Sequence, residues 1–504
     1  MSHSSMRNNR RIFRKCKRRK QNRERRAPRL NCGGAVFNAS NIHYAIGEKV
    51  QAVNCGGIGA IHQMVGKVGL ADDIDEALHL LKIHMPYHES DHVLNIAYNV
   101  LAGGMRLEDM ELRRNDEAYL SALDAERTPD PTTAGDFTRR FSVSDIETLM
   151  DAINTTRQRV WQRCSGDLIN EAFIDVDGTI AGTLGRCKHG MDISYKGIWG
   201  YHPLIVSLAN TKEILFMENR PGNVASHQGA AKWIDKAIVL VKPHTQRITL
   251  RGDTDFSLTG HFDRWGDDVD FIFGMDARRA LVDEAEWLPA GRWWFLDRKA
   301  KPKPETRRRK KPKKVKEAIV RKRGFETLHT TGEMVAEFDY RPGKCKKDYR
   351  VVVVRKNISH EKGEAVLFDD IRYFFYITTR RDLTPSQVVR LANERCDQEN
   401  VIEQLKNGVH AMRMPVDNLL SNWSYMVMAS LAWNLKAWFA MMMRSSKREK
   451  VLKMEFRQFL NNMMLLPCQI VRQGRQIIYR ILTYNDWLSD LITTHERIRR
   501  MTFT

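Results

Sequence analysis

The sequence has few cysteines, and none of them belongs to a closely spaced pair. Its eight cysteines are scattered over 504 residues without a Cys-x-x-Cys motif. Disulfide-stapled secreted domains are short and dense in cysteine, and structural zinc sites use closely spaced Cys and His ligands. This absence argues against both, and it favours free thiols in a reducing cytoplasm.

No segment has the length and apolarity of a membrane span. The most apolar run, residues 423–443, is interrupted by Asn434 and Lys436, whereas a spanning helix needs ~20 apolar residues with few charges. The basic N-terminus leads into Ala-Pro-Arg rather than into the apolar core of a secretory signal. We therefore expect no membrane partner, and we expect residues 423–443 to form a buried helix.

Acidic residues are scarce in two segments that hold most of the basic charge. Residues 1–30 contain 13 Lys and Arg against Glu24 alone, and residues 298–323 contain 15 against Glu305 and Glu317. The net charge of the chain is +21, so the other residues sum to −4. Such blocks are typical of arms or loops that meet a polyanion, most often nucleic acid.

Residues 31–165 are predicted to be mostly helical. Apolar residues recur at helical spacing in 74–85 and 92–101, and residues 142–153 begin with a capping-type pattern. Behind a basic arm, such a region is suited to recognising duplex DNA. A generic helical scaffold explains the same pattern equally well, so both interpretations stay open.

Residues 170–275 have the pattern of an α/β sheet. The order is three strands, a helix, a strand, a helix and a strand, with the strands predicted at 172–176, 201–209, 213–218, 247–252 and 268–274 and the first helix at 226–241. This order fits a sheet of the ribonuclease H type, whose catalytic acids sit at strand ends.

Residues 276–380 interrupt this pattern with a basic Lys-Pro-Lys-Pro stretch and β-rich runs at 349–356 and 373–379. A helix is predicted over 385–407. The expected organisation is a basic arm (1–30), a helical DNA-binding region (31–165), a ribonuclease H-like catalytic core (166–275 and 381–445), a β-rich insertion (276–380) with the basic loop 298–323, and a helical C-terminal region (446–504).

Two acids close apolar strands in the expected core. Asp177 and Asp253 each follow such a run, and a small or hydroxyl residue comes next. Two-metal phosphoryl transfer needs carboxylates that converge from distant parts of the chain, because hard divalent ions take oxygen ligands. Turn formation or helix capping also explains many such Asp residues.

The predicted helix at 385–407 adds a third acid between two cations. Arg395, Glu399 and Lys406 fall at about 0°, 40° and 20° around an α-helix, which is one face. A salt-bridge ladder on a solvated surface is one interpretation of this stripe. The other is a carboxylate metal ligand flanked by two cations that hold phosphates.

The stretch Arg395-Cys-Asp-Gln-Glu399-Asn-Val-Ile-Glu-Gln-Leu-Lys406 resembles the Tyr-x2-Arg-x3-Glu-x6-Lys signature of DDE transposases from bacterial insertion sequences. The insertion sequence "thirteen-eighty" family looks most similar. The resemblance covers about 128–440 and includes Asp130-Pro-Thr-Thr, Ile174-Asp-Val-Asp177-Gly-Thr179, the segment 195–204, Arg220-Pro-Gly-Asn and Arg251-Gly-Asp253-Thr-Asp-Phe256.

This resemblance implies that Asp177, Asp253 and Glu399 are the catalytic and metal-binding acids. Asp175, Asp255 and Glu403 are their neighbouring competitors, but they fit the family spacing less well. Arg395 and Lys406 would hold phosphates at the transposon end. The signature Tyr falls on Ala392, so the resemblance does not extend to the residue that grips a terminal phosphate or an extruded base.

In relatives, a β-rich insertion precedes the Glu helix, and a Trp on it stacks on a flipped base. The resemblance makes Trp293 and Trp294 candidates for that contact, and core or surface packing is the alternative. The basic loop supplies further DNA-binding candidates: Arg307, Arg308, Arg309, Lys310 and Lys311.

The resemblance implies a Mg²⁺-dependent transposase, with Mn²⁺ as a substitute, that cuts transposon ends and joins the 3′-OH to target DNA. Its partners would be double-stranded DNA, both terminal inverted repeats and target, and it would act as a dimer on paired ends in the bacterial nucleoid. Two alternatives stay open: an inactive DNA-binding regulator derived from a transposase, and a ribonuclease H-like nuclease without strand transfer.

Overall fold

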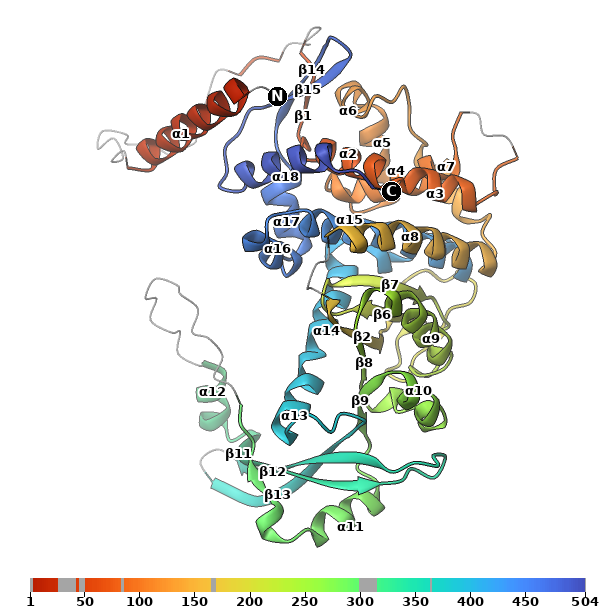
Figure 1. Cartoon of the computed structure of the whole chain (residues 1–504), viewed down its shortest axis with the longest axis vertical. Coiled ribbons are helices and arrows are strands. Elements are labelled where there is room, and N and C mark those ends of the chain that lie inside the picture. The colour runs from red at the N-terminus through yellow and green to blue at the C-terminus, as the bar shows by residue number, and fades with distance from the viewer. Residues whose placement is uncertain are drawn as a thin grey trace. The chain divides into compact units, whose positions relative to one another are not determined.

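The computed structural model describes residues 3–25, 42–44, 50–82, 86–164, 169–298, 315–362 and 365–503. The contacts divide the chain into two compact units (Figure 1). Unit 1 comprises residues 1–165 and 404–504, and unit 2 comprises residues 166–403. Unit 2 contains the two strand-end acids.

Unit 2 is built on a mixed nine-stranded sheet in the order β10-β11-β12-β13-β9-β8-β2-β6-β7. β2 pairs in parallel with β8 and antiparallel with β6, and β8 pairs in parallel with β9. The strands of this core are β2 (Glu171–Gly178), β6 (Leu204–Leu208), β7 (Glu213–Glu218), β8 (Arg247–Gly252) and β9 (Asp270–Met275). With α9 (Ala230–Val241) and α10 (Phe262–Asp268) between them, the predicted order of three strands, helix, strand, helix and strand is confirmed.

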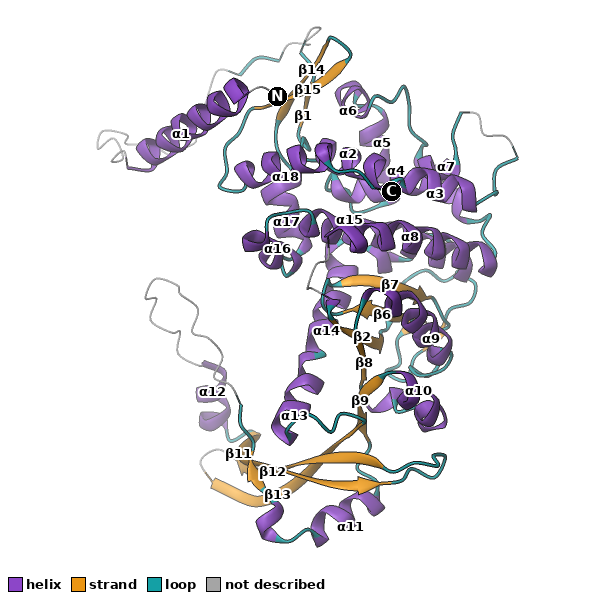
Figure 2. Ribbon diagram, viewed as in Figure 1, coloured by secondary structure: helices purple, strands orange, loops and turns teal. Residues whose placement is uncertain are grey.

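Helices cover both faces of this sheet. Figure 2 shows α9 and α10 on one face, and α13 (Pro385–Glu394) and α14 (Cys396–Glu403) on the other. α9 buries Trp233, Ile234, Ala237 and Val241, which recur at helical spacing. β6 and β7 are almost wholly buried apolar runs, as expected for strands covered on both faces.

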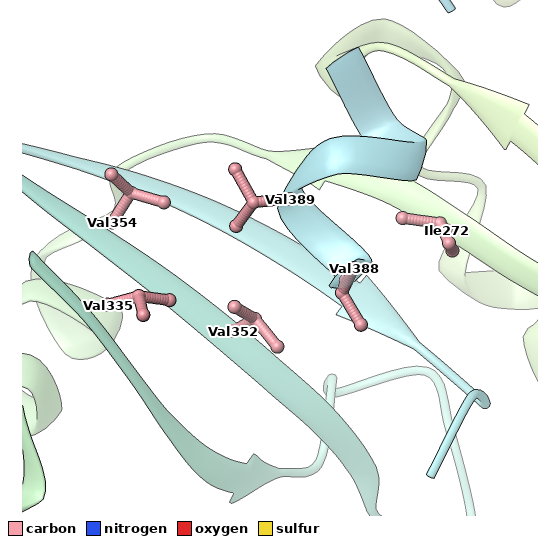
Figure 3. Close-up of a cluster of buried hydrophobic side chains, with 6 residues drawn as sticks. All are labelled: Ile272, Val335, Val352, Val354, Val388 and Val389. Atoms are coloured by element: carbon pink, nitrogen blue, oxygen red, sulfur yellow. The ribbon is translucent and has the colours of Figure 1, made fainter. Parts of the chain in front are cut away.

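The β-rich insertion extends the core sheet. β11 (Glu326–Tyr340), β12 (Tyr349–Lys362) and β13 (Ala365–Thr378) form an antiparallel meander, and β13 pairs with β9. Ile272, Val335, Val352, Val354, Val388 and Val389 form one buried cluster (Figure 3). Because this cluster joins β9, two insertion strands and α13, the insertion supports the helix that leads to Arg395. The other elements of the insertion are α11 (Arg279–Trp287), β10 (Trp294–Phe295) and α12 (Val315–Arg323).

A buried ion pair joins the two central parallel strands. Arg251 on β8 donates from Nε and Nη2 to both carboxylate oxygens of Asp175 on β2, at 2.7 and 2.8 Å, and the two side chains are 3% and 1% exposed. Arg251 Nη1 also donates to the carbonyl of Leu391 on α13 at 3.1 Å. One guanidinium therefore holds β2, β8 and α13 together.

Unit 1 combines the helices before residue 165 with the end of the chain. Its helices are α1 (His3–Arg25), α2 (Ile58–Val68), α3 (Leu70–Ala77), α4 (Glu89–Leu101), α5 (Met110–Arg114), α6 (Glu117–Leu123), α7 (Pro131–Thr138), α8 (Val143–Cys164), α15 (Leu419–Met441), α16 (Ser445–Leu452), α17 (Phe456–Phe459) and α18 (Leu488–Arg500). α15 is buried along nearly its whole length and packs on α4 and α8, which confirms the buried helix expected at 423–443. None of the described helices is long and apolar enough to cross a bilayer.

The predicted helix at 74–85 is shorter than expected. α3 ends at Ala77, because the buried carboxylate of Glu89 accepts hydrogen bonds from the backbone N–H groups of Leu80 and Leu81, both at 2.9 Å. These bonds replace the intrahelical ones, so a tertiary contact overrides the helical pattern. Residues 83–85 lie outside the described residues.

The C-terminal region, expected to be helical, also contains a hairpin. β14 (Cys468–Gln473) and β15 (Gln476–Ile481) pair antiparallel, and β14 pairs with β1 (Ala52–Val53). Gly474 and Arg475 both have φ of +57°, as the two-residue turn of such a hairpin requires. The observed units also differ from the expected organisation in that 404–445 belong to unit 1 and not with the sheet.

Removing the guanidinium that joins β2, β8 and α13 should destabilise unit 2. Arg251→Ala leaves the Asp175 carboxylate buried and unpaired, which costs about 3–5 kcal/mol. Arg341→Ala is the matched control, because Arg341 pairs with Asp348 at 2.8 Å on the surface, where such pairs contribute about 0–1 kcal/mol. Urea unfolding of both variants measures the difference, and equal losses would contradict this role for Arg251.

Candidate functional site

Asp177 and Asp253 lie at the same edge of the sheet. β2 and β8 are parallel neighbours in which Asp175 is paired with Arg251. Asp177 follows Asp175 by two residues, and Asp253 follows Arg251 by two residues. Residues i and i+2 of a strand point to the same face. Adjacent strands are ~4.8 Å apart, so the register brings the two carboxylates together.

The electrostatics of the two acids reflect this proximity. Burial raises the pKa of Asp177 to about 6, with the charge of Asp253 adding to the rise and that of Arg395 opposing it. Burial also raises the pKa of Asp253, Arg395 lowers it, and Asp255 raises it further. Asp253 accepts a hydrogen bond from the backbone N–H of Asp255 at 3.0 Å, which caps the short turn Thr254–Phe256.

Arg395 is the cation of this site. Its Nη1 donates to Asp177 Oδ2 at 3.0 Å, and the two side chains are 16% and 15% exposed. The charges of Asp177, Asp253 and Asp175 all raise the pKa of Arg395, against burial, which lowers it. The structure therefore brings together two of the three predicted acids and one of the two predicted cations.

The segment that carries Arg395 is not one continuous helix, as the sequence predicted for 385–407. α13 begins with a capping box formed by Thr384 and Gln387, and it ends at Glu394; α14 begins at Cys396. Arg395 keeps helical backbone angles at the junction, φ −56° and ψ −23°. The interruption places Arg395 beside the end of β2.

Gln398 is a positioning residue that the sequence analysis did not identify. It is buried on α14, where it accepts a hydrogen bond from the Ser207 hydroxyl and donates to the Ile205 carbonyl at 3.4 Å. Lys212 and Asp397 form an ion pair at 2.7 Å nearby. These contacts fix α14 on β6, and a single buried Gln in an otherwise polar helix gives no recognisable signal in the sequence.

Glu399 does not join the acid pair in this structure. It is exposed on α14, and within the described ranges no three His, Cys, Asp or Glu residues lie close enough to hold a metal ion. Lys406 belongs to unit 1, in the π-helical turn Gln404–Gly408. Because that turn departs from 100° per residue, the single face predicted for Arg395, Glu399 and Lys406 does not apply.

The neighbouring acids considered as competitors have other surroundings. Asp175 is held by Arg251 in the buried pair and has no access to solvent. Asp255 and Glu403 are exposed. Among the strand-end acids, Asp177 and Asp253 are the ones that lie together and remain open enough to receive a ligand.

The two tryptophans of the insertion differ in exposure. Trp293 is 8% exposed, and the guanidinium of Arg355 lies 4.7 Å from its ring centroid. Trp294, on β10, is 49% exposed. Packing therefore occupies Trp293, while Trp294 remains available to a ligand. Arg307, Arg308, Arg309, Lys310 and Lys311 lie outside the described residues.

His202 is a second residue near the acids that had no assigned role. Its Nδ1 lies 2.7 Å from the Val224 carbonyl, which places the proton on Nδ1 and leaves Nε2 as an acceptor. Nε2 faces Gly178, where an added Cβ would lie 3.0 Å away. Burial lowers the pKa of His202, which keeps the ring neutral.

The donor chemistry of the site suits a hard divalent cation in part. Two carboxylates at neighbouring strand ends provide the oxygen ligands that Mg²⁺ and Mn²⁺ accept. The guanidinium of Arg395 offsets part of the pair's negative charge, and no third acid of the described residues lies close enough to complete a metal site. The fit thus rests on Asp177 and Asp253, and a further oxygen ligand has to come from elsewhere.

Comparisons with known proteins identify the family of this chain. Residues 47–503 match the family model described as "Transposase DDE domain group 1". No curated protein sequence matches the chain. A solved structure described as a piggyBac transposase synaptic complex with hairpin DNA aligns with 81% of this chain and 80% of that chain, at 11% sequence identity and a TM-score of 0.37.

The raised pKa of Asp177 predicts a specific dependence of stability on pH. The unfolded chain releases this proton near the ordinary value of 3.8, whereas folded Asp177 keeps it up to about 6. Between these values the folded state binds more protons, so stability falls as the pH rises through the window. Across this pH window, the free energy of unfolding of the wild type should fall by about 2 kcal/mol relative to that of Asp177→Asn. Urea unfolding in metal-free buffer measures this difference.

Asp348 provides a control of opposite sign. The hydrogen bond from Arg341 lowers the pKa of Asp348, so protonation at low pH weakens this contact. The wild type should therefore become more stable than Asp348→Asn as the pH rises. A flat difference between the wild type and Asp177→Asn would contradict the electrostatic account of the acid pair.

Proposed function

Because the chain belongs to the Transposase DDE domain group 1 family, we propose that it is a DNA transposase that cuts transposon ends and joins the freed 3′-OH to target DNA. The observation that carries this proposal is the pair of acids, Asp177 and Asp253, at adjacent strand ends with Arg395 between α13 and α14. Family membership alone implies transposition. The acid pair supports a catalytically competent chain.

Asp177 and Asp253 would hold the divalent ion, Mg²⁺ or Mn²⁺. When bound, such ions activate the attacking oxygen and stabilise the leaving one. Asp177 must lose its proton and its guanidinium partner to serve as a ligand, because a carboxylate binds metal in its ionised form. Glu399, on the turn of α14 that follows Arg395, would supply the further carboxylate, so the proposal requires Glu399 to turn toward the pair.

Arg395 would exchange its partner during this step. A guanidinium binds a phosphate in the same planar, bidentate manner as a carboxylate. If a cation engaged Asp177, Arg395 would be free to bind a phosphate of the bound strand. In this proposal, the salt bridge at 3.0 Å is the arrangement without metal, and Arg395 would contact DNA once the ion is bound.

DNA binding would draw on the basic segments. The arm at residues 1–30 and the block at 298–323 would make sequence-independent phosphate contacts, and the helices of unit 1 would read the inverted repeats. Trp294, half exposed on β10, stays the candidate for a stacking contact in the insertion, and Lys406 for a phosphate contact. We expect two copies to assemble on paired ends.

A catalytically inactive DNA-binding regulator is the second candidate. Two observations favour it: Ala392 stands at the signature Tyr position, and Glu399 is apart from the acid pair in the part of the chain that the structure describes. End cleavage separates this candidate from the first, and joined target DNA separates a transposase from a nuclease.

The decisive variants are Asp177→Ala, Asp253→Ala and Glu399→Ala, tested for Mg²⁺-dependent cleavage of inverted repeats to be identified in the DNA on either side of the reading frame. Each should lower the cleavage rate by about 10³-fold or more, because losing a metal ligand removes several kcal/mol of transition-state stabilisation. Asp255→Ala and Glu403→Ala, exposed acids close to two of these positions in sequence, are matched controls and should cleave normally. A wild type that binds ends without cutting them would favour the regulator.

A further inference from the structure

Directly after the strand that carries Asp177, unit 2 forms a second, small sheet separate from the nine-stranded one. It consists of β3 (Ala181–Gly182), β4 (Asp192–Ile193) and β5 (Trp199–Tyr201) in the order β3-β5-β4. Its base is anchored where the backbone N–H of Thr179 donates to the Pro203 carbonyl at 2.9 Å. The chain then enters β6 through His202, so both ends of this small sheet adjoin the acid site.

The small sheet exposes large apolar side chains among basic ones. Tyr195 is 77% exposed and Trp199 is 54% exposed, and the other exposed members are Leu184, Ile193 and Ile198. Between residues 181 and 201, the basic residues Arg186, Lys188 and Lys196 outnumber the single acid, Asp192. Aromatic rings interleaved with cations are typical of surfaces that bind single-stranded nucleic acid.

The tip of the small sheet presents one ring and one cation from a well-ordered turn. The Gly197 N–H donates to the Ser194 carbonyl at 2.8 Å, and the Ile198 N–H donates to the Ser194 hydroxyl at 3.1 Å. Gly197 has φ of +72°, which closes this turn. The Lys196 ammonium lies 5.3 Å from the centroid of the Tyr195 ring.

Tyr195 lies within reach of the acid site through His202. The two ring centroids are 6.5 Å apart, and His202 in turn abuts Gly178, which follows Asp177. Tyr195 is therefore linked to the Asp177 strand end through a single side chain, that of His202.

We propose that Tyr195 stacks on an unpaired nucleobase next to the cleaved phosphate, while Lys196 contacts the adjoining phosphate. This inference rests on the proposed action on DNA and specifies the form of DNA that the site accepts. A base inside a duplex has both faces covered by its neighbours, so the ring can stack only on a base that is unpaired or flipped out of the duplex. The excess of basic charge favours a nucleic acid over an apolar protein partner.

The test compares two probes on the full-length chain without divalent ions: a blunt DNA duplex, and the same duplex with a single-stranded extension. Tyr195→Ala should weaken binding of the extended probe by about 5- to 150-fold, the usual effect of removing one base-stacking ring, and should leave the blunt duplex unaffected. Tyr195→Phe should bind like the wild type. Val239→Ala removes an exposed apolar side chain on α9, outside the small sheet; it is the control and should have no effect.

Photocrosslinking locates the contact independently of affinity. With 5-iodouracil in the extension, the adduct should lie on the tryptic peptide 189–196, in which Tyr195 is the sole Tyr, Phe or Trp. Adducts confined to other peptides would overturn the proposal. An equal loss of affinity for both probes in Tyr195→Ala would overturn it as well. Loss of self-association in Tyr195→Ala without loss of probe binding would identify an interface between copies instead.

Different results would contradict the proposed action on DNA and the stacking contact of Tyr195. A wild type that binds neither probe contradicts both the proposed function and this inference. A wild type that binds DNA and cuts transposon ends, but shows the same preference for the extended probe with and without the Tyr195 ring, contradicts the stacking contact alone.

Discussion

The contact on which the site depends is the buried pairing of Arg251 with Asp175. It holds β8 and β2 in a register that brings Asp253 and Asp177 to the same face, because each acid lies two residues beyond a member of the pair. The same guanidinium holds the Leu391 carbonyl on α13. Arg395 follows Leu391 by four residues, one helical turn, and reaches Asp177. A single desolvated cation thus sets the positions of two acids and of the second cation.

Burial and charge act against each other at the acid pair. Desolvation and mutual repulsion favour protonated carboxylates, while Arg395 favours ionised ones. In the proposed function, a divalent ion would take over the neutralising role of Arg395, and the freed arginine would then contact the DNA. The insertion contributes to this arrangement, because its strands share the valine-rich cluster that supports α13 (Figure 3).

The sequence predicted the core strands well, because a buried strand is a continuous apolar run and the residues that begin and end it can be recognised in the local sequence. It also placed Asp177 and Asp253 at strand ends. It did not predict that β13 pairs with β9, because the insertion's attachment depends on a pairing between residues about a hundred positions apart. The early end of α3 and the break at Arg395 both accompany tertiary contacts that helical periodicity does not encode. Glu89 binds the backbone that follows α3, and Asp177 on β2 binds Arg395. Gln398 and His202 lacked a pattern of their own.

The central claim is that Asp177 and Asp253 form one divalent-metal site. A crystal structure of the chain with Mn²⁺, analysed by anomalous scattering, tests it most directly. The account predicts an anomalous peak that contacts both carboxylates, at about the 2.0–2.2 Å expected for small divalent ions and oxygen ligands, with Arg395 withdrawn from Asp177. A saturated crystal in which Arg395 still pairs with Asp177 and no peak lies between the two acids would contradict it.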